Sequence, residues 1–212
     1  YPVSILLAWI TTPEVFKAVV RERLAGLPFF SKAEAWVGEK VELLARLNIL
    51  MGAALGIYTG VLLGTMAARP LWNSALLGPL FLVSGLSSGA AFMLLYGLKD
   101  QERIFLGRAD MALIAVELVI LALWMIGLGS AGASSQAALG VIFGGPYTAA
   151  FWTLVVALGL VAPLVGEWVE HKHGAVPGKG TAILVLMGGF ALRWILVFGG
   201  QATGWVTEIA AR

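Results

Sequence analysis

The chain has no cysteine and only two histidines among its 212 residues. Without thiolate ligands we expect no disulfide, no thiolate zinc site and no iron–sulfur cluster in this chain. The two histidines, His171 and His173, stand together in a polar segment, whereas a haem in a membrane helix bundle needs an axial ligand inside a span. We therefore predict no haem and no other metal site.

Charge is also scarce, because 12% of the residues are charged and 59% are hydrophobic. Soluble domains usually contain about 25% charged residues, so this composition and a mean hydropathy of +0.90 place the chain in a membrane. The net charge of +2 would suggest nucleic acid in a soluble protein. Here the basic residues flank apolar segments, where they orient helices. We therefore expect contact with membrane lipid and no nucleic-acid binding.

Long apolar runs are abundant. Five stretches are long enough to cross about 30 Å of hydrocarbon as helices: residues 43–66, 74–97, 110–130, 147–168 and 181–201. They predict an all-α integral membrane protein, a polytopic transmembrane helix bundle occupying residues 43–212.

Residues 1–42 differ from the rest of the chain. The apolar run 3–10 is too short to span, and residues 11–42 carry ten of the 26 charged residues. Neither a basic leader region nor a small-residue cleavage motif is present. We interpret residues 1–42 as a charged connecting segment in the later part of a longer polypeptide, with further helices upstream that bring the bundle to about eight spans.

Lys and Arg are distributed unequally between the two sides of the predicted bundle. Of the fourteen, eleven lie in the N-terminal segment, at the start of the first span or in the connections after the second and fourth spans. Since cytoplasmic loops collect Lys and Arg, we expect the N-terminal segment on the cytoplasmic side of a bacterial inner membrane. The corner 68–73, the uncharged connection 131–146 and the C-terminus then face outward.

Glycine recurs in the first span at a spacing of four residues: Gly52, Gly56, Gly60 and Gly64. Such a ridge lets another helix backbone approach closely, and Gly85 and Gly89 repeat the spacing in the second span. Tyr58 lies two residues from the nearest ridge glycines, about 200° round the helix, and so points away from the ridge.

Ionisable groups inside the hydrocarbon are costly and therefore candidates for function. Glu117 and Arg193 lie within predicted spans, where they form either a structural ion pair or part of a proton relay or water-filled cavity. Asp110 and Glu167 lie at the cytoplasmic ends of spans, where they are either simply solvated or an entrance for protons. The proton-relay candidates are Glu117, Arg193, Asp110, Glu167, Ser84 and Ser88.

Serine in the second span has two interpretations. Ser84, Ser87 and Ser88 can all bond to backbone carbonyls one turn earlier, and for Ser84 and Ser88 the alternative is a place in that relay.

Hydrolase, phosphate-loop and zinc-protease motifs are absent, since the sequence contains no GxSxG, GxxxxGK[ST] or HExxH. What remains is a site for an apolar ligand. The predicted position of Tyr58 is the outer third of the bilayer, below the corner, where a phenol can donate a hydrogen bond to a quinone carbonyl. Tyrosines are also common at membrane interfaces, so this residue alone does not identify a site.

Three segments resemble the NrfD/PsrC family, the membrane subunits of polysulfide reductase and related respiratory complexes. They are residues 58–64 (YTGVLLG), residues 69–74 (RPLWNS) and residues 79–89 (PLFLVSGLSSG). Arg193 followed by residues 197–201 (VFGGQ) is similar to the last helix of that family. The resemblance covers about residues 43–204.

The resemblance implies a bundle of about eight helices that exchanges electrons between menaquinone or ubiquinone and an outward-facing, four-cluster ferredoxin-like iron–sulfur subunit. That subunit is in turn attached to a molybdopterin catalytic subunit or a multihaem cytochrome. The resemblance assigns Tyr58 to the quinone pocket, which an upstream helix with a histidine helps to form. We add three corner residues as quinone-binding candidates: Arg69, Trp72 and Asn73.

Our leading hypothesis is a quinone-binding membrane anchor of a respiratory oxidoreductase. It is a non-autonomous subunit that docks its iron–sulfur partner on the outward corner and that could also conduct protons. Two alternatives remain open. One is a polytopic transporter or ion channel that uses Glu117 and Arg193 at mid-membrane. The other is a purely structural anchor without a quinone site.

Overall fold

The computed structural model describes Trp36 and residues 39–66, 68–96, 98–173 and 178–203. Most of the predicted connecting segment 1–42 and the end of the chain after residue 203 therefore lie outside the described residues. Within them every regular element is a helix, which confirms the all-α prediction. The chain divides into two compact units, residues 1–55 and 56–212, and each is described by itself.

Five helical segments are long and apolar enough to cross a membrane, and they confirm the five predicted spans. They are α4 (Val41–Gly64), α5 (Leu77–Leu94), α6 (Asp100–Ser130), the continuous helical segment Thr148–Lys172, and α10 (Lys179–Ala202). The segment Thr148–Lys172 is made of α8 (Thr148–Ala150), the π-helix η1 (Phe151–Val161) and α9 (Ala162–Lys172). A short helix, α7 (Ala133–Leu139), lies within the connection that we predicted as a loop.

The first unit contributes the N-terminal part of α4 to the described residues. This part of the helix exposes large apolar side chains, including Ile49, Leu50 and Met51. One polar contact in this part is an ion pair one turn apart, in which Arg46 Nη2 lies 2.6 Å from Glu42 Oε1. Such exposed pairs contribute little to stability. The apolar exposure is that of a helix whose surroundings are hydrocarbon rather than water.

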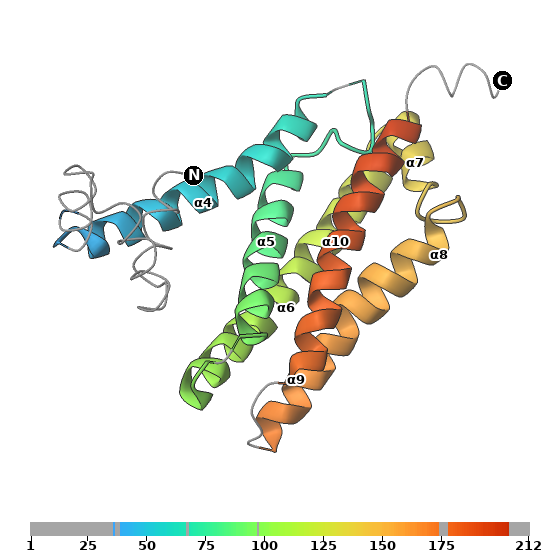
Figure 1. The fold of residues 1–212 in the computed structure, drawn as a ribbon. Coiled ribbons are helices and arrows are strands. Elements are labelled where there is room, and N and C mark those ends of the chain that lie inside the picture. The colour runs from blue at the N-terminus through green and yellow to red at the C-terminus, as the bar shows by residue number, and fades with distance from the viewer. Residues whose placement is uncertain (1–35, 37–38, 67, 97, 174–177, 204–212) are drawn as a thin grey trace, which may run out of the picture. The chain divides into compact units, whose positions relative to one another are not determined.

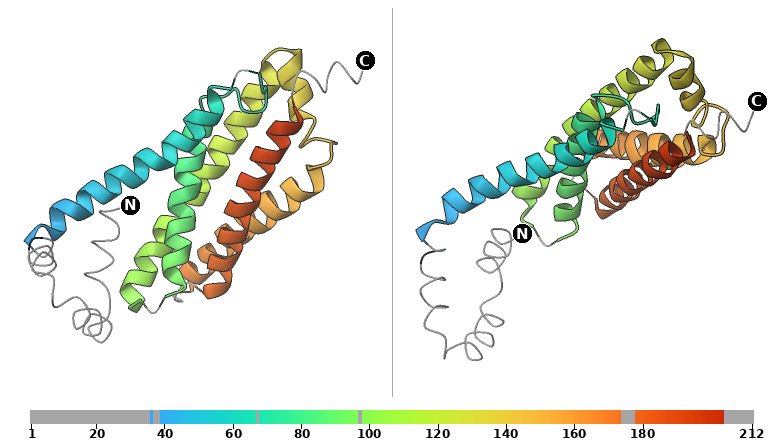
Figure 2. Two further views of the ribbon diagram at one scale, coloured as in Figure 1. Left: turned by 45° about the horizontal axis from the view of Figure 1, so that its top comes forward. Right: turned by 90° about the horizontal axis from the view of Figure 1, so that it is seen from above.

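In the second unit α5 packs against both α6 and α10, while η1 packs against α10, and α9 packs against α6 and α10 (Figures 1 and 2). The α5–α6 and α9–α10 connections lie at one end of this unit, and the α4–α5 corner and α7 lie at the other. The core between the helices is filled by large apolar side chains, with Trp124, Phe151 and Leu192 fully buried.

Glycines bring α4 and α5 together within the second unit. A Cβ on Gly60 would overlap the backbone of Leu77 and Gly78, and one on Gly64 would lie 3.3 Å from the Ser74 carbonyl oxygen. The predicted glycine ridge is thus confirmed for the part of α4 in this unit. The parallel prediction for α5 is wrong, because Gly85 faces the guanidinium of Arg193 rather than a helix backbone.

The π-helix η1 has a local cause. Pro163, at the start of α9, has no N–H, and its ring excludes the carbonyl of the residue four positions earlier, Gly159. The ladder of hydrogen bonds therefore cannot run as a regular α-helix through this point. Gly159 also packs directly on the backbone of Gly188 of α10. This close crossing fixes η1 against α10.

Candidate functional site

One face of α6 carries the buried residues of this helix at helical spacing: Gly107, Asp110, Ile114, Glu117, Leu121, Trp124 and Leu128. Two of them are carboxylic acids seven residues apart, or about 10 Å along the helix axis. Each acid meets a serine of α5, because Ser84 and Ser87 are also buried and lie three residues apart on one helix face. The polar groups therefore fall into two layers.

The first layer contains Ser87, Asp110 and Glu167, and we call its two acids the carboxyl pair. Ser87 Oγ donates a hydrogen bond to Asp110 Oδ1 over 2.5 Å. Glu167, from α9, lies close enough to Asp110 for the two carboxyl groups to act on each other electrostatically. Asp110 is 0% exposed and Glu167 is 3% exposed. Of the two alternatives for the acids at these span ends, the one in which they are simply solvated is therefore wrong.

The second layer contains Ser84, Glu117 and Arg193, and we call it the guanidinium layer. Arg193 Nη1 donates a hydrogen bond to Ser84 Oγ over 3.3 Å, and Ser84 also interacts with the carboxyl group of Glu117. Since a hydroxyl both donates and accepts, Ser84 links the acid of α6 to the base of α10. The structure thus brings together three of the predicted relay residues.

Two glycines make room for Arg193. A Cβ on Gly85 would lie 3.6 Å from Arg193 Nη2, and one on Gly189 would lie 3.2 Å from Nη1 and 2.6 Å from Ser88 Oγ. The guanidinium also donates to the Gly189 carbonyl over 2.8 Å. Ser88, the remaining predicted relay residue, is therefore next to this layer. The glycine spacing in the sequence indicated helix packing here and did not reveal the space for a side chain.

Ser87 is the residue that sequence reasoning left out of the relay set. Its hydroxyl binds a carboxylate of another helix, and Ser84 likewise has a side-chain partner. The signal that could have identified it is its spacing of three residues from Ser84, which places both serines on one face of α5, just as a spacing of seven places the two acids on one face of α6.

The corner between α4 and α5 is attached to the end of α10. Trp72 Nε1 donates a hydrogen bond to the Leu196 carbonyl over 2.6 Å, and Trp72 is 5% exposed. The half-buried Arg69 donates through Nη1 to the carbonyl of Gln201. A cation at the C-terminal end of a helix is favourable because carbonyl groups there lack partners along the chain. Both predicted quinone-binding side chains therefore already have protein acceptors.

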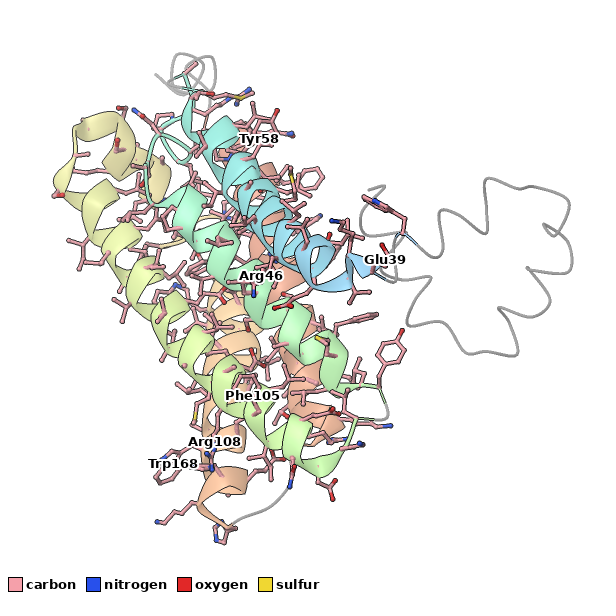
Figure 3. All side chains as sticks on the ribbon, turned by 90° about the vertical axis from the view of Figure 1, so that its left-hand side faces the viewer. Glu39, Arg46, Tyr58, Phe105, Arg108 and Trp168 are labelled. Atoms are coloured by element: carbon pink, nitrogen blue, oxygen red, sulfur yellow. The ribbon has the colours of Figure 1, made fainter. Side chains whose placement is uncertain are left out.

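Tyr58 and Asn73 are placed differently. Tyr58 is 58% exposed on α4, near the corner and at the opposite end of this unit from Phe105, Arg108 and Trp168 (Figure 3). Asn73 is exposed in the corner itself. Neither side chain forms a hydrogen bond with the described residues, so both polar groups are free to contact a ligand.

An apolar groove of about 200 Å³ lies between η1 and α10. Its lining residues are Leu154, Leu158, Leu184, Met187, Phe190, Ala191 and Trp194. The groove offers almost only hydrocarbon contacts, since Trp194 is the one lining residue whose side chain has a polar group, so among the described residues the chemistry is concentrated in the two polar layers and at the corner.

Comparison with known proteins identifies relatives of this protein. Residues 1–204 match the family described as "Polysulphide reductase, NrfD". The protein is 32% identical over 170 residues to Protein NrfD of Escherichia coli K12, covering 76% of this sequence and 53% of that protein. It is 31% identical over 166 residues to the C chain of polysulfide reductase from Wolinella succinogenes, covering 73% and 52%. The Protein NrfD homolog of Haemophilus influenzae is 30% identical over 165 residues, with coverage of 73% and 51%.

The chain spans about half the length of the curated relatives that it matches. No solved structure matches it.

Proposed function

Because this chain belongs to the NrfD family of polysulphide reductase proteins, we propose that it is a membrane subunit of a respiratory oxidoreductase complex. In this proposal it binds menaquinone or ubiquinone and exchanges electrons with a partner iron–sulfur subunit. The family assignment is the observation that carries the proposal. One relative is named as the C chain of a reductase, which supports a role within a multisubunit assembly.

Tyr58 is the residue proposed to hold the quinone. Its phenol is exposed on α4 and can donate a hydrogen bond to a carbonyl group. Asn73, exposed in the corner, can offer both a donor and an acceptor. A quinone supplies the redox chemistry when it is bound, and these two side chains orient its polar head.

Arg69 and Trp72 are proposed to act at the same site by positioning it. Both donate to carbonyl groups of α10, and so they fix the corner that carries Asn73. In the proposed orientation this corner faces outward, where a four-cluster ferredoxin-like subunit docks. That subunit connects to a molybdopterin enzyme or a multihaem cytochrome.

The guanidinium layer is proposed to carry protons. Ser84, Glu117 and Arg193 join three helices in the middle of the bundle, where ionisable groups are costly unless they serve a purpose. Replacing Glu117 with Gln should slow turnover of the complex while leaving quinone affinity intact. Unaltered turnover would assign Glu117 to a structural ion pair with Arg193.

The quinone site is tested by Tyr58→Phe in the intact complex. Loss of one hydrogen bond, worth about 1 kcal/mol, should weaken quinone and quinone-inhibitor binding about 3- to 10-fold, measured by inhibitor titration and by the KM for quinol. Tyr96→Phe is the matched control, because Tyr96 is similarly exposed but lies at the opposite end of α5.

If Tyr58→Phe binds quinone and inhibitor as tightly as the wild type, the assignment of Tyr58 is wrong. Mass spectrometry of lipids extracted from the purified complex gives a second measurement. A complex that copurifies with no quinone would instead be a structural anchor.

A further inference from the structure

The two polar layers of the bundle differ in their balance of charge. Each layer contains a serine of α5 and an acid of α6. The third group is Arg193 in the guanidinium layer and Glu167 in the layer of the carboxyl pair. The acid of the guanidinium layer therefore has a cation to neutralise it. The carboxyl pair combines two acids and no base.

Burial makes this imbalance costly. Asp110 and Glu167 are almost completely buried, and Asp110 Oδ2 and both carboxyl oxygens of Glu167 form no hydrogen bond of regular geometry with the described residues. A buried ionised carboxylate without a partner costs several kcal/mol. Two adjacent carboxylates would add their mutual repulsion to that cost.

The surroundings give the pair little positive charge. From α5 the pair meets the neutral hydroxyl of Ser87. Two further acids add negative charge, because Asp110 and Glu117 of α6 repel each other and Glu170 of α9 repels Glu167. Arg103 of α6 stands two turns before Asp110, about 10 Å away along the helix axis. α10 carries two bases: Lys179, which is exposed at the first residue of the helix, and Arg193, whose charge acts on Glu117. The pair therefore needs a positive charge that these contacts do not provide.

We propose that Asp110 and Glu167 form a proton-binding site in which the two carboxyl groups share a single proton, carried by Glu167. Ser87 decides the position of the proton, because its hydroxyl donates to Asp110 Oδ1 and so stabilises the ionised form of Asp110. The protonated Glu167 then donates to Asp110 Oδ2. This arrangement gives a partner to two of the three unpaired oxygens and leaves one carboxyl oxygen of Glu167 as an acceptor.

The alternative occupant is a monovalent metal ion such as Na⁺. The described side chains offer such an ion the three unpaired carboxyl oxygens and the Ser87 hydroxyl. The neighbouring backbone carbonyls of α5, α6 and α9 are used in helical hydrogen bonds. One proton joins two of these oxygens without further ligands, and the proton is therefore the occupant that the geometry favours.

The inference rests on the proposed function only in that the helices lie in a membrane, and its test does not involve quinone. The complex in its native membrane is treated with dicyclohexylcarbodiimide, a hydrophobic reagent that adds to protonated carboxylic acids and leaves a stable acylurea. Peptide mass spectrometry should find the label on Glu167 at neutral pH. Glu170 is the internal control on the same helix, because both of its oxygens accept from the Gly178 N–H, and it should stay unlabelled.

Titration and variants define the site further. Labelling of Glu167 should decline as the pH rises, because the reagent needs the bound proton. Infrared spectroscopy should show the C=O stretch of a protonated acid that shifts in D₂O, disappears in Glu167→Gln and persists in Asp110→Asn. Labelling, its pH titration and the D₂O shift are all measured on the wild-type complex, so these results do not depend on whether a variant folds.

Three results would overturn the proposal. Protection of Glu167 by Na⁺ at constant pH would identify a sodium site, and label on Asp110 alone would place the proton on the wrong acid. Absence of both the label and the infrared band in the wild type would show that the carboxyl pair binds no proton. Each result is independent of quinone affinity, so failure here leaves the quinone proposal unaffected.

Discussion

At the scale of single residues, Trp72 shows how a side chain expected at a ligand site can be used by the protein itself. Its position after a span and before another was evident from the sequence. Its partner was not, because the Leu196 carbonyl lies more than a hundred positions along the chain and its location depends on how α10 packs. The same limit applies to Arg69 and Gln201.

The Trp72 indole packs so closely on α10 that it requires a glycine at one position of that helix, which gives a residue-scale prediction. The ring occupies the place where a Cβ on Gly200 would project, whereas a Cβ on Gly199 would make ordinary contacts at 3.5 Å or more. Gly200→Ala should therefore destabilise the protein by about 1–3 kcal/mol, measured as unfolding in detergent.

Gly199→Ala is the adjacent control and should be neutral or slightly stabilising, because alanine favours helix over glycine by up to about 1 kcal/mol. Equal stability of the two variants would show that Trp72 does not pack on Gly200 as described.

The carboxyl pair illustrates a second limit at this scale. Hydropathy places the third span at residues 110–130, and Asp110 then looks like a solvated residue at its end. In the structure α6 begins at Asp100, so Asp110 lies about 15 Å from the start of the helix. Glu102, which accepts a hydrogen bond from the Lys99 N–H over 3.0 Å, stabilises that early start. Composition alone does not reveal that the helix extends through the polar residues that precede Asp110.

At the scale of elements, helix existence and length were predictable because apolar runs must match the thickness of a membrane. The π-helix η1 was not, although Pro163 was visible in the sequence. A proline marks where the backbone ladder is interrupted, but the form of the interruption depends on the neighbouring helix. Here that neighbour is α10, whose Gly188 meets Gly159 backbone to backbone.

This crossing supports an element-scale prediction. A Cβ on Gly188 would overlap the backbone of Gly159, whereas one on Gly180 of the same helix would meet nothing within 4 Å. Gly188→Ala should force η1 and α10 apart and lower the resistance of the purified protein to unfolding by SDS, at a cost of about 1–3 kcal/mol. Gly180→Ala should behave like the wild type, and a Gly188→Ala protein that is equally resistant would contradict the crossing.

At the scale of the whole molecule, the absence of cysteine permits a direct test of the proposed orientation. Asn73, in the α4–α5 corner, and His173, at the C-terminal end of α9, are exposed, and that corner and that helix end lie at opposite ends of the second unit (Figure 1). A single cysteine at position 73 should react with a membrane-impermeant maleimide in spheroplasts. A single cysteine at position 173 should react only after the cells are opened, because Lys and Arg favour the cytoplasmic side.

The reverse pattern of labelling would place the corner in the cytoplasm and remove the proposed docking side for the iron–sulfur partner. Labelling of both positions from one side would contradict the arrangement of the spans. Retained quinol oxidation by each single-cysteine complex is the check that the substitutions leave the fold intact.

The two polar layers also have a mechanical consequence. Ser84 and Ser87 lie on one rigid helix that carries no charge of its own in Leu77–Leu94, yet each serine holds an acid of α6. Rotation of α5 about its axis would break the contacts of Ser84 and Ser87 with the acids together, because both hydroxyls move with the same helix. The helix α5 begins at the corner that is hydrogen-bonded to α10. A displacement of that corner would therefore be transmitted along α5 to both polar layers.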